Sequence, residues 1–331
     1  MSYSRERAIA VSAVETACRL GEAVRAELAP ADTMVKADKS PVTVADFGIQ
    51  SQVSLALRAA IPDVRLVAEE EGEDLWGEER SGIREAVADH VRRVVPGVTE
   101  EDALAALSQG GGSEAGGSGR FWTLDPVDGT KGFLRGGQYA IALALIEDGE
   151  VVLGVLGCPN FAVDASDPNG PRGCLFVAVK GEGTRMRSLI DGAERAVRVS
   201  EIADPARAVF CESVEAAHSS HDQAGRITTL LGVSAPPARM DSQCKYAAVA
   251  RGDATVYLRL PTRADYVEKI WDHAAGCLVV TEAGGEVSDV HGRPLDFSCG
   301  RTLSANRGVI ATNGKLHADV QRAVQEVLPP D

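Results

Sequence analysis

The stretch WTLDPVDGTKG, residues 122–132, constrains this chain more than any other part of its sequence. Its apolar start, with Trp122 and Leu124, predicts a buried strand. Two carboxylates, Asp125 and Asp128, follow where we expect this strand to end. The predicted strand therefore ends in a pair of acids.

A small polar turn follows the two acids. Gly129, Thr130 and Lys131 are typical of a turn that leads into a helix, and the free N–H groups at the start of a helix bind anions. Carboxylates bind divalent cations, and a cation beside a phosphate assists its hydrolysis. Two acids next to an anion site therefore indicate metal-assisted phosphate chemistry.

Length and charge bound the possible functions. The chain has 331 residues and should bury roughly three quarters of its unfolded surface, so two domains are expected. We predict an N-terminal domain over residues 1–198 and a C-terminal domain over residues 199–331. Lys and Arg total 34 against 48 Asp and Glu, a formal net charge of −14. This charge argues against nonspecific binding to nucleic acid polymers or anionic membranes.

The cysteine pattern and the first residues indicate a compartment. The seven cysteines are scattered and form no CxxC pair, which favours a reducing environment over a disulfide framework. The chain shows no signal-peptide h-region, and no apolar run approaches the ~20 residues that span a bilayer. We expect a cytoplasmic protein, with a plastid or mitochondrion as the alternative if a transit segment was removed.

The first 198 residues predict a helix layer on a mostly antiparallel sheet. Apolar residues at three- and four-residue spacing predict a helix over 5–28, and Thr43 marks the start of a second helix with Asp46 in its first turns. The acidic run 69–71 directly follows a short predicted strand. Strands are predicted over 64–68, 121–124, 138–146, 151–156 and 174–180, helices over 83–95 and 99–107, and a flexible loop over 110–119.

Near residue 199 the pattern changes to alternating strands and helices, which is typical of an α/β domain. The stretch IWDHAAGCLVVTEAGG predicts a helix from Ile270 that carries Asp272 in its first turn and ends at Gly284. The other elements predicted here are strands over 208–211, 254–258 and near 286 and 309, and helices over 222–231, 242–250 and 316–327.

Five acids stand at the ends of predicted elements. They are Asp46, Glu69, Asp125, Asp128 and Asp272. A single aspartate at a strand end is typical of a turn, so the hypothesis rests on the set and on the DPVDGT string. Magnesium prefers oxygen ligands, and a group of Asp and Glu without adjacent His or Cys suits it better than zinc or copper.

Four stretches resemble the magnesium-dependent, lithium-sensitive phosphatase superfamily of inositol monophosphatase: VTVADF, the EEE run, LDPVDGTKGF and IWDHAAG. Within that superfamily, LRGGQYAIALAL, GCPN, HSSHD, MDSQCKYA and YLRLP resemble the 3'(2'),5'-bisphosphate nucleotidases of the fungal and plant type. The likeness runs from about Lys36 to Val309 with the motifs in the expected order. It implies an α/β layered sandwich with αβαβα order, the sugar-phosphatase type.

The resemblance also implies a metal site with two or three Mg²⁺ ions. One ion would bind Glu69, Asp125 and the carbonyl of Val127, and a second would bind Asp125, Asp128 and Asp272. The superfamily usually has Gly-Glu-Glu where this chain has Ala-Glu-Glu, so Glu70 stays open as the alternative to Glu69.

The catalytic roles implied by the resemblance fall on two residues far apart in the sequence. Asp46 and Thr130 match the pair that orients and deprotonates the attacking water. The backbone of Gly129 and Thr130 would hold the reacting phosphate. A hydroxyl beside an activated water can relay its proton to a carboxylate, so the chemistry of these two side chains is consistent with the implied roles.

Substrate selection is expected from the second domain. The resemblance places His218, Ser242, Lys245 and Arg259 around the nucleotide, where Lys and Arg can pair with phosphate. Without the motif match, His218 would be a surface or capping residue and Lys245 an ordinary solvated one. Nearby Cys211 and Cys244 raise the hypothesis that oxidation disturbs the pocket, although reduced core thiols are the simpler interpretation.

The resemblance implies hydrolysis of adenosine 3',5'-bisphosphate to AMP and phosphate, with 3'-phosphoadenylyl sulfate as a second substrate. An inositol polyphosphate 1-phosphatase acting on inositol 1,4-bisphosphate stays open, because the metal chemistry is shared and only the pocket differs. A nucleotide-binding sensor with little turnover is the alternative from another class. Inhibition by lithium or calcium is implied by the resemblance alone.

Overall fold

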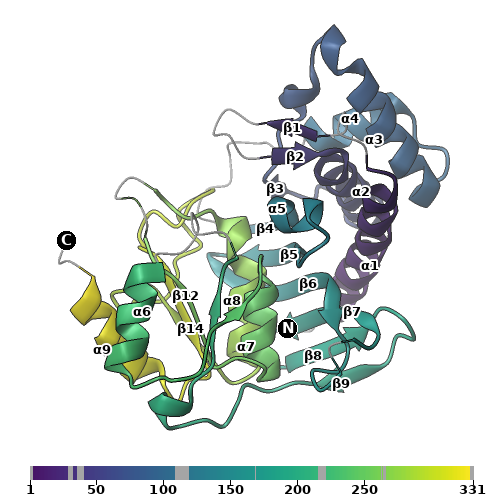
Figure 1. The fold of residues 1–331 in the computed structure, drawn as a ribbon. Coiled ribbons are helices and arrows are strands. Elements are labelled where there is room, and N and C mark those ends of the chain that lie inside the picture. The colour runs from purple at the N-terminus through teal and green to yellow at the C-terminus, as the bar shows by residue number, and fades with distance from the viewer. Residues whose placement is uncertain are drawn as a thin grey trace.

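The computed structural model describes residues 3–28, 33–35, 41–108, 119–167, 169–214, 221–261, 263 and 266–328. His218 and nearly all of the predicted loop over 110–119 lie outside these residues. Within them, helices and sheets alternate in layers, as expected for the αβαβα sandwich (Figure 1). None of the helices described is both long enough and apolar enough to cross a membrane.

The larger sheet has seven strands in the order β3-β4-β5-β6-β7-β8-β9. Only β3 and β4 pair in parallel, and every other neighbouring pair is antiparallel. The strands are β3 (Leu66–Ala68), β4 (Arg120–Asp128), β5 (Ala140–Glu147), β6 (Glu150–Ala162), β7 (Arg172–Val179), β8 (Gly183–Ser188) and β9 (Glu194–Ala196). The predicted mostly antiparallel sheet is therefore confirmed, with two strands, β8 and β9, that the sequence pattern did not identify.

Both faces of this sheet are buried, and β5 shows why its sequence is apolar throughout. Ala140, Ala142 and Ala144 face one core, while Leu143 and Leu145 face the other. The alanine face lies toward α7 (Cys244–Arg251) and α8 (Ala274–Glu282), and the leucine face lies toward α1 (Ser4–Glu27) and α2 (Val44–Ala60). Small side chains on the first face allow a helix to approach closely.

The close approach is tightest where α8 crosses β6. A Cβ built on Gly154 would lie 2.9 Å from the carbonyl oxygen of Ala275, so a larger residue would force the helix away from the sheet. The helix layer formed by α7 and α8 therefore packs directly on the larger sheet, although both helices come from the second half of the chain.

The smaller sheet has five strands in the order β11-β10-β12-β14-β13. Its members are β10 (Phe210–Glu212), β11 (Ala238–Arg239), β12 (Val256–Arg259), β13 (Glu286–Ser288) and β14 (Val309–Thr312). One face packs on α7 and α8, and the other forms a separate core with α6 (His221–Leu230) and α9 (His317–Val327). The predicted domain boundary after residue 198 falls between β9 and β10 and stays a prediction.

Smaller elements extend the N-terminal part. The hairpin β1 (Thr33–Val35) and β2 (Pro41–Thr43) leads into α2, and α3 (Ser81–Val94) and α4 (Glu100–Ser108) pack beside α2. Four 3₁₀ helices complete the described structure, at Gly72–Leu75, Glu78–Arg80, Pro205–Arg207 and Ile270–Asp272.

Candidate active site

The two acids of the DPVD stretch lie on an irregular strand end. The prediction of a strand that ends in acid is confirmed, and β4 includes both carboxylates and continues to Asp128. Asp125 pairs with Ala142 and Asp128 with Ala140, so β4 has one residue more than β5 between these two pairs. The extra residue follows from Pro126, which has no N–H to donate, and such a bulge turns neighbouring side chains in new directions.

A short helix, α5 (Thr130–Leu134), begins immediately after this strand. Its N-cap is Gly129 with φ +84°, a left-handed conformation that favours glycine. A Cβ on Gly129 would also lie 3.0 Å from the Cβ of Ser242 in the second half of the chain. The predicted turn into a helix is therefore confirmed, and glycine is required there both for its φ angle and for space.

Asp46 and Thr130, the predicted water-activating pair, lie side by side. Asp46 is 1% exposed in the first turn of α2, and its Oδ2 accepts hydrogen bonds from the backbone N and the Oγ1 of Thr43, at 2.7 and 2.6 Å. This arrangement is a capping box that fixes the carboxylate. The other oxygen, Oδ1, lies 3.4 Å from Thr130 Oγ1, which also lies 3.2 Å from the carbonyl oxygen of Val127.

Asp125 interacts electrostatically with all four other acids of the group. It is 2% exposed, and its Oδ1 has no hydrogen-bond partner among the described residues. Burial raises the pKa of Asp125 well above its usual value, and the nearby charges of Glu69, Asp128, Asp272 and Asp46 raise it further. The structure therefore brings all five predicted acids within electrostatic reach of one another.

Asp128 faces the second half of the chain. Its Oδ2 accepts a hydrogen bond of 2.6 Å from the backbone N–H of Gln243. Burial raises the pKa of Asp128, while the charges of Lys245 and Arg259 oppose that shift. Two of the predicted substrate residues are thus close enough to act electrostatically on a predicted metal ligand.

The prediction that Asp272 lies in the first turn of an α-helix is wrong. Asp272 ends the 3₁₀ helix Ile270–Asp272, which precedes α8. His273 has φ −135° and ψ −32°, and this break in the helical backbone separates the two segments. Burial raises the pKa of Asp272 to about 8, against the lowering effect of Arg259. The Asp272 carboxylate lies 3.4 Å from a nitrogen of the Arg259 guanidinium.

The structure distinguishes Glu69 from Glu70 by their surroundings. The charge of Glu69 contributes to the raised pKa of Asp125, Asp128 and Asp272. Glu70 is 1% exposed, and its backbone N–H and C=O form hydrogen bonds of 3.0 and 2.7 Å with the side chain of Gln50. The proximity of the Glu69 charge to these three acids favours Glu69 as the ligand, and its role stays a prediction with Glu70 as the alternative.

Three of the predicted substrate residues lie near α7 and β12: Ser242 precedes α7, Lys245 is in its first turn, and Arg259 ends β12. Ser242 has φ +68°, rare for a residue other than glycine, and such strain is often found at functional sites. Lys245 is 3% exposed, and burial lowers its pKa while the charge of Asp128 opposes the shift. Tyr257 presents its ring to the Lys245 ammonium at 5.2 Å. His218 lies outside the described residues.

Arg259 is held by a chain of buried groups. Its Nε lies 2.7 Å from Glu268 Oε2, and that oxygen also accepts a 3.1 Å hydrogen bond from His273 Nε2. Burial lowers the pKa of His273, so its ring is neutral and its Nδ1 accepts the 2.7 Å hydrogen bond from Tyr246. Despite its burial, the pKa of Glu268 is lowered to about 2 by Arg259 and His273.

Two residues with clear roles in this arrangement were missed by the sequence reasoning. Gln243 donates through its amide to the Trp271 carbonyl at 2.9 Å and accepts from the Gly276 N–H at 3.2 Å, so it joins α7 to the segment that carries Asp272. Glu268 orients Arg259, as described above. Gln243 stands inside the MDSQCKYA stretch, and its place between Ser242 and Lys245, two residues already singled out, was the available signal.

Residues Glu268, Asp272 and His273 place one possible ligand atom each within 4.8 Å of one another. Glu268 and His273 are hydrogen-bonded to Arg259 and Tyr246, whereas the charge of Asp272 also acts on Asp125 in the acid group. The acid group itself fits a divalent cation: it has a buried carboxylate oxygen with no donor in the described chain and mutual repulsion that a cation would relieve.

Comparison with known proteins places this geometry in context. A protein-family model described as inositol monophosphatase family matches residues 6–328 of this chain. A 3'(2'),5'-bisphosphate nucleotidase of Emericella nidulans is 45% identical over 357 residues, covering 99% of each chain. One of Oryza sativa is 47% identical over 342 residues, covering 98% of this chain and 95% of the relative. The suhB structure of Bartonella henselae matches with a TM-score of 0.66 at 22% identity, covering 97% of this chain and 98% of that one, and supports the fold.

Proposed function

Because the chain belongs to the inositol monophosphatase family, we propose that it is a magnesium-dependent phosphatase that converts adenosine 3',5'-bisphosphate to AMP and phosphate. The observation that carries the proposal is the acid group around Asp125, together with the Asp46–Thr130 pair at the start of α5. The nucleotidases of Emericella nidulans and Oryza sativa, similar over almost their whole length, support the substrate class.

The acids would hold the metal ions. Glu69, Asp125 and the Val127 carbonyl would bind one Mg²⁺, and Asp125, Asp128 and Asp272 a second. Bound Mg²⁺ supplies Lewis acidity, which lowers the pKa of water and offsets negative charge on the phosphate. The buried Asp125 Oδ1, with no donor in the described chain, supports its role as the shared ligand.

The proton of the attacking water would leave through Thr130 and Asp46. The Thr130 hydroxyl accepts the proton from water and passes its own to Asp46 Oδ1, so one proton moves along each link. The capping box keeps Asp46 Oδ2 occupied, and Oδ1 is the oxygen that faces Thr130. The backbone N–H groups at the start of α5 would hold the reacting phosphate.

The nucleotide would lie against the second half of the chain. His218, Ser242, Lys245 and Arg259 are the residues we assign to it, and the strained backbone of Ser242 beside Gly129 supports contact there. 3'-Phosphoadenylyl sulfate is the second proposed substrate and would yield adenylyl sulfate. Only the phosphate on the ribose 3' position reacts in either case.

A phosphate-release assay tests the proposal. We expect magnesium-dependent release from adenosine 3',5'-bisphosphate at a higher kcat/KM than from inositol 1,4-bisphosphate, with inhibition by lithium and calcium. Faster turnover of the inositol compound would favour an inositol polyphosphate 1-phosphatase. Tight nucleotide binding without release would favour a sensor, so the three readings give different results.

A further inference from the structure

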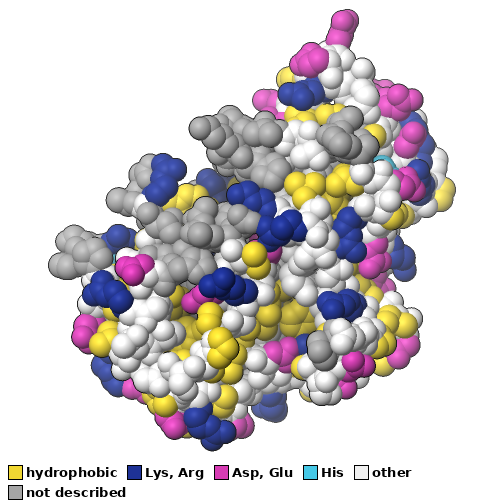
Figure 2. All heavy atoms as spheres, viewed as in Figure 1, with side chains coloured by type: hydrophobic (Ala, Val, Ile, Leu, Met, Phe, Trp, Pro, Cys, Tyr) yellow, Lys and Arg dark blue, Asp and Glu magenta, His cyan; other side chains and the backbone are white. Residues whose placement is uncertain are grey.

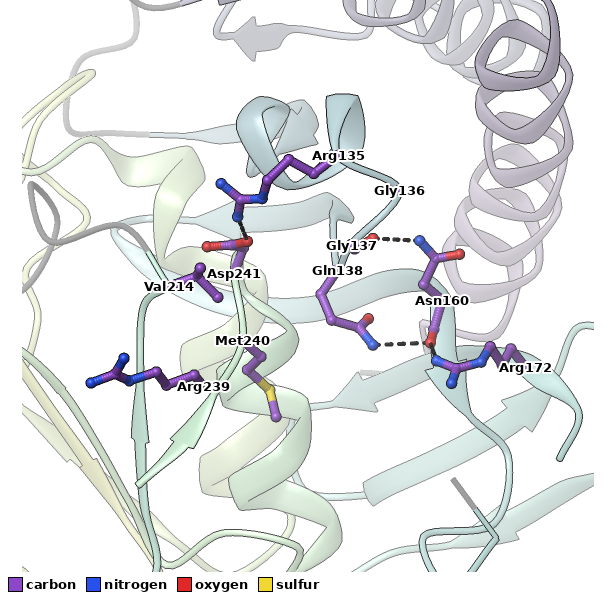
Figure 3. A pocket seen from close by; sticks show the side chains of 10 residues that line it. All are labelled: Arg135, Gly136, Gly137, Gln138, Asn160, Arg172, Val214, Arg239, Met240 and Asp241. Carbon is purple, nitrogen blue, oxygen red and sulfur yellow. Dashed lines mark hydrogen bonds and ion pairs between the residues drawn. The ribbon is translucent and has the colours of Figure 1, made fainter. Parts of the chain in front are cut away.

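Arginine side chains join the two halves of the chain at more than one place. Basic side chains gather near the middle of the molecular face drawn in Figure 2. One contact borders a cavity of about 400 Å³, where Arg135 of the first half pairs with Asp241 of the second (Figure 3). Two further arginines, Arg172 and Arg239, line the same cavity. Another arginine, Arg301, joins the halves outside it, beside the acid group.

Arg301 comes from the second half of the chain and reaches the end of β3 in the first. Its Nη2 donates to the carbonyl oxygen of Ala68 at 3.1 Å, across 233 positions of the sequence. The same peptide group carries the N–H of Glu69, which donates to the carbonyl oxygen of Leu124 on β4 at 3.2 Å. A peptide group is planar, so these two bonds fix it from both sides. The backbone that presents Glu69 is therefore held between β4 and Arg301.

The guanidinium of Arg301 also lies over an aromatic ring beside a second acid. Its Cζ is 4.8 Å from the centre of the Trp271 ring, and Trp271 directly precedes Asp272. The backbone of Arg301 is bonded to the same segment, because the N–H of Ile270 donates to its carbonyl oxygen at 3.2 Å. Arg301 is thus tied through its backbone and through its side chain to the segment that carries Asp272.

The positive charge of Arg301 does not by itself account for this place. Its Nη1 is buried and has no hydrogen-bond partner among the described residues, and burial lowers the pKa of Arg301 against the effect of Glu71. A buried donor without a partner costs free energy. Arg259 is the cation with the largest effect on the pKa of Asp272. The contacts of Arg301 therefore point to a role in geometry rather than in neutralising the acids.

We propose that Arg301 is a positioning residue that holds Glu69 and Asp272 in the relative position at which each reaches its Mg²⁺ ion. This inference rests on the metal site of the proposed function, in which the two acids bind different ions that share Asp125. Groups that orient metal ligands contribute a factor of roughly 10–100 to metal affinity. Arg301 acts through the backbone before Glu69 and through Trp271, and it is not itself a ligand.

Calorimetric titration of the metal-free protein with Mg²⁺ tests this role without nucleotide or turnover. Arg301→Met keeps an unbranched side chain but removes the donors, and it should raise the Mg²⁺ dissociation constant by about tenfold. A role through charge alone predicts the opposite sign, because removal of a nearby cation strengthens the binding of Mg²⁺. An unchanged or lower dissociation constant in Arg301→Met would therefore overturn the inference.

A variant that keeps the charge separates it from the planar guanidinium. Arg301→Lys cannot both donate to the Ala68 carbonyl and stack a planar group on Trp271, so its dissociation constant should lie between those of the wild type and Arg301→Met. If Arg301→Met does not fold, Arg301→Lys decides, and wild-type affinity in it would overturn the inference.

A double-mutant cycle shows whether Arg301 acts through Glu69. In a Glu69→Gln background the positioned carboxylate is already lost, so Arg301→Met should raise the dissociation constant by only about threefold or less. The same factor in both backgrounds would show that Arg301 acts independently of Glu69, against the proposal.

Arg251 provides a matched control for general loosening between the halves. Its guanidinium also lies over a ring, 4.3 Å from the centre of Phe161, and it also donates to a carbonyl of the first half, that of Ala162, at 2.6 Å. Arg251 ends α7, whereas Gln243, which contacts the acid group, precedes its start. Arg251→Met should lower the melting temperature in EDTA and leave the Mg²⁺ dissociation constant unchanged. An equal loss of Mg²⁺ affinity in Arg251→Met and Arg301→Met would refute a specific role.

Phosphate release is measured separately on the same proteins. A wild type that binds Mg²⁺ but releases no phosphate from adenosine 3',5'-bisphosphate would refute the proposed function, and the titrations would still decide the role of Arg301. A wild type that binds no Mg²⁺ would refute both.

Discussion

The carboxylate of Asp46 lies beside the hydroxyl of Thr130, with 3.4 Å between Oδ1 and Oγ1, although 84 positions separate them in the chain. Asp46 is fixed from one side by the helix cap at Thr43, and Thr130 stands at the first position of α5. A proton acceptor and a hydroxyl relay are thereby held together at the edge of the acid group.

Replacement of Thr130 separates binding from hydrolysis. Thr130→Ala should retain nucleotide binding and lower kcat by roughly 10²–10⁴-fold, because the proton relay is lost while the backbone N–H groups remain. Thr130→Ser, which keeps the hydroxyl, should stay much closer to the wild type. Single-turnover hydrolysis and equilibrium binding measure the two properties, and a near-normal kcat in Thr130→Ala would refute the relay.

Replacement of Asp125 should reveal the repulsion within the acid group. Without metal, Asp125→Asn should melt at a higher temperature than the wild type at pH 7.5, because it removes a carboxyl group whose ionisation is opposed in the folded chain by burial and by four other acids. With Mg²⁺ the wild type should gain more stability than the variant, because a ligand is missing in the variant. Thermal unfolding with EDTA or Mg²⁺ tests both, and Glu73→Gln, an exposed acid, is the control. Equal stabilisation of both proteins by Mg²⁺ would contradict the role of Asp125.

Two glycine-to-alanine changes in helices should have opposite signs. Alanine is favoured over glycine in a helix by about 1 kcal/mol, and Gly225 in α6 has open space around a built Cβ. Gly276 in α8 would place its Cβ 2.2 Å from Tyr246 Cδ2, so overpacking of about 1–3 kcal/mol outweighs the helix preference. Urea unfolding should show Gly225→Ala stabilised and Gly276→Ala destabilised. A stable Gly276→Ala would mean that α7 and α8 are not packed this closely.

The buried His317 should lower the free energy of unfolding at mildly acidic pH. Its Nε2 lies 2.8 Å from Ser288 Oγ, its Nδ1 lies 3.1 Å from Thr312 Oγ1, and burial lowers its pKa, partly opposed by Glu286. The unfolded chain binds a proton near pH 6.5, while the folded chain does so only at lower pH. The contribution to stability is therefore complete above about pH 6.5 and declines as the pH falls toward the folded pKa.

A His317→Gln variant isolates this contribution from other titrating groups. Free energies of unfolding from urea titrations at pH 7.5, 6.5 and 5.5, all in EDTA, should fall less steeply in the variant than in the wild type. Parallel pH profiles would show that His317 does not titrate differently in the folded and unfolded chain.

Local sequence signals determined most individual elements. The alternation of alanine with leucine fixed both faces of β5, and Asp148 and Gly149, with φ of +49° and +81°, form the turn between the two predicted strands β5 and β6. The Thr43 cap places Asp46 where a helix start was predicted. Strand β8 was not predicted, because its alternation of buried and exposed residues is short and its outward side chains include Arg185, whose partner Glu194 lies on β9.

The sequence alone determined which residues carry carboxylates and where most helices and strands begin, because caps, turns and apolar periodicity act over a few residues. The tertiary structure decided which acids meet. Packing of α7 and α8 on the larger sheet brings Gln243 to Asp128 and Asp272 to Asp125, and it forms the arginine-lined cavity between the two halves. These contacts span more than a hundred positions, and no local preference encodes them, because they depend on how closely a helix layer fits between two sheets.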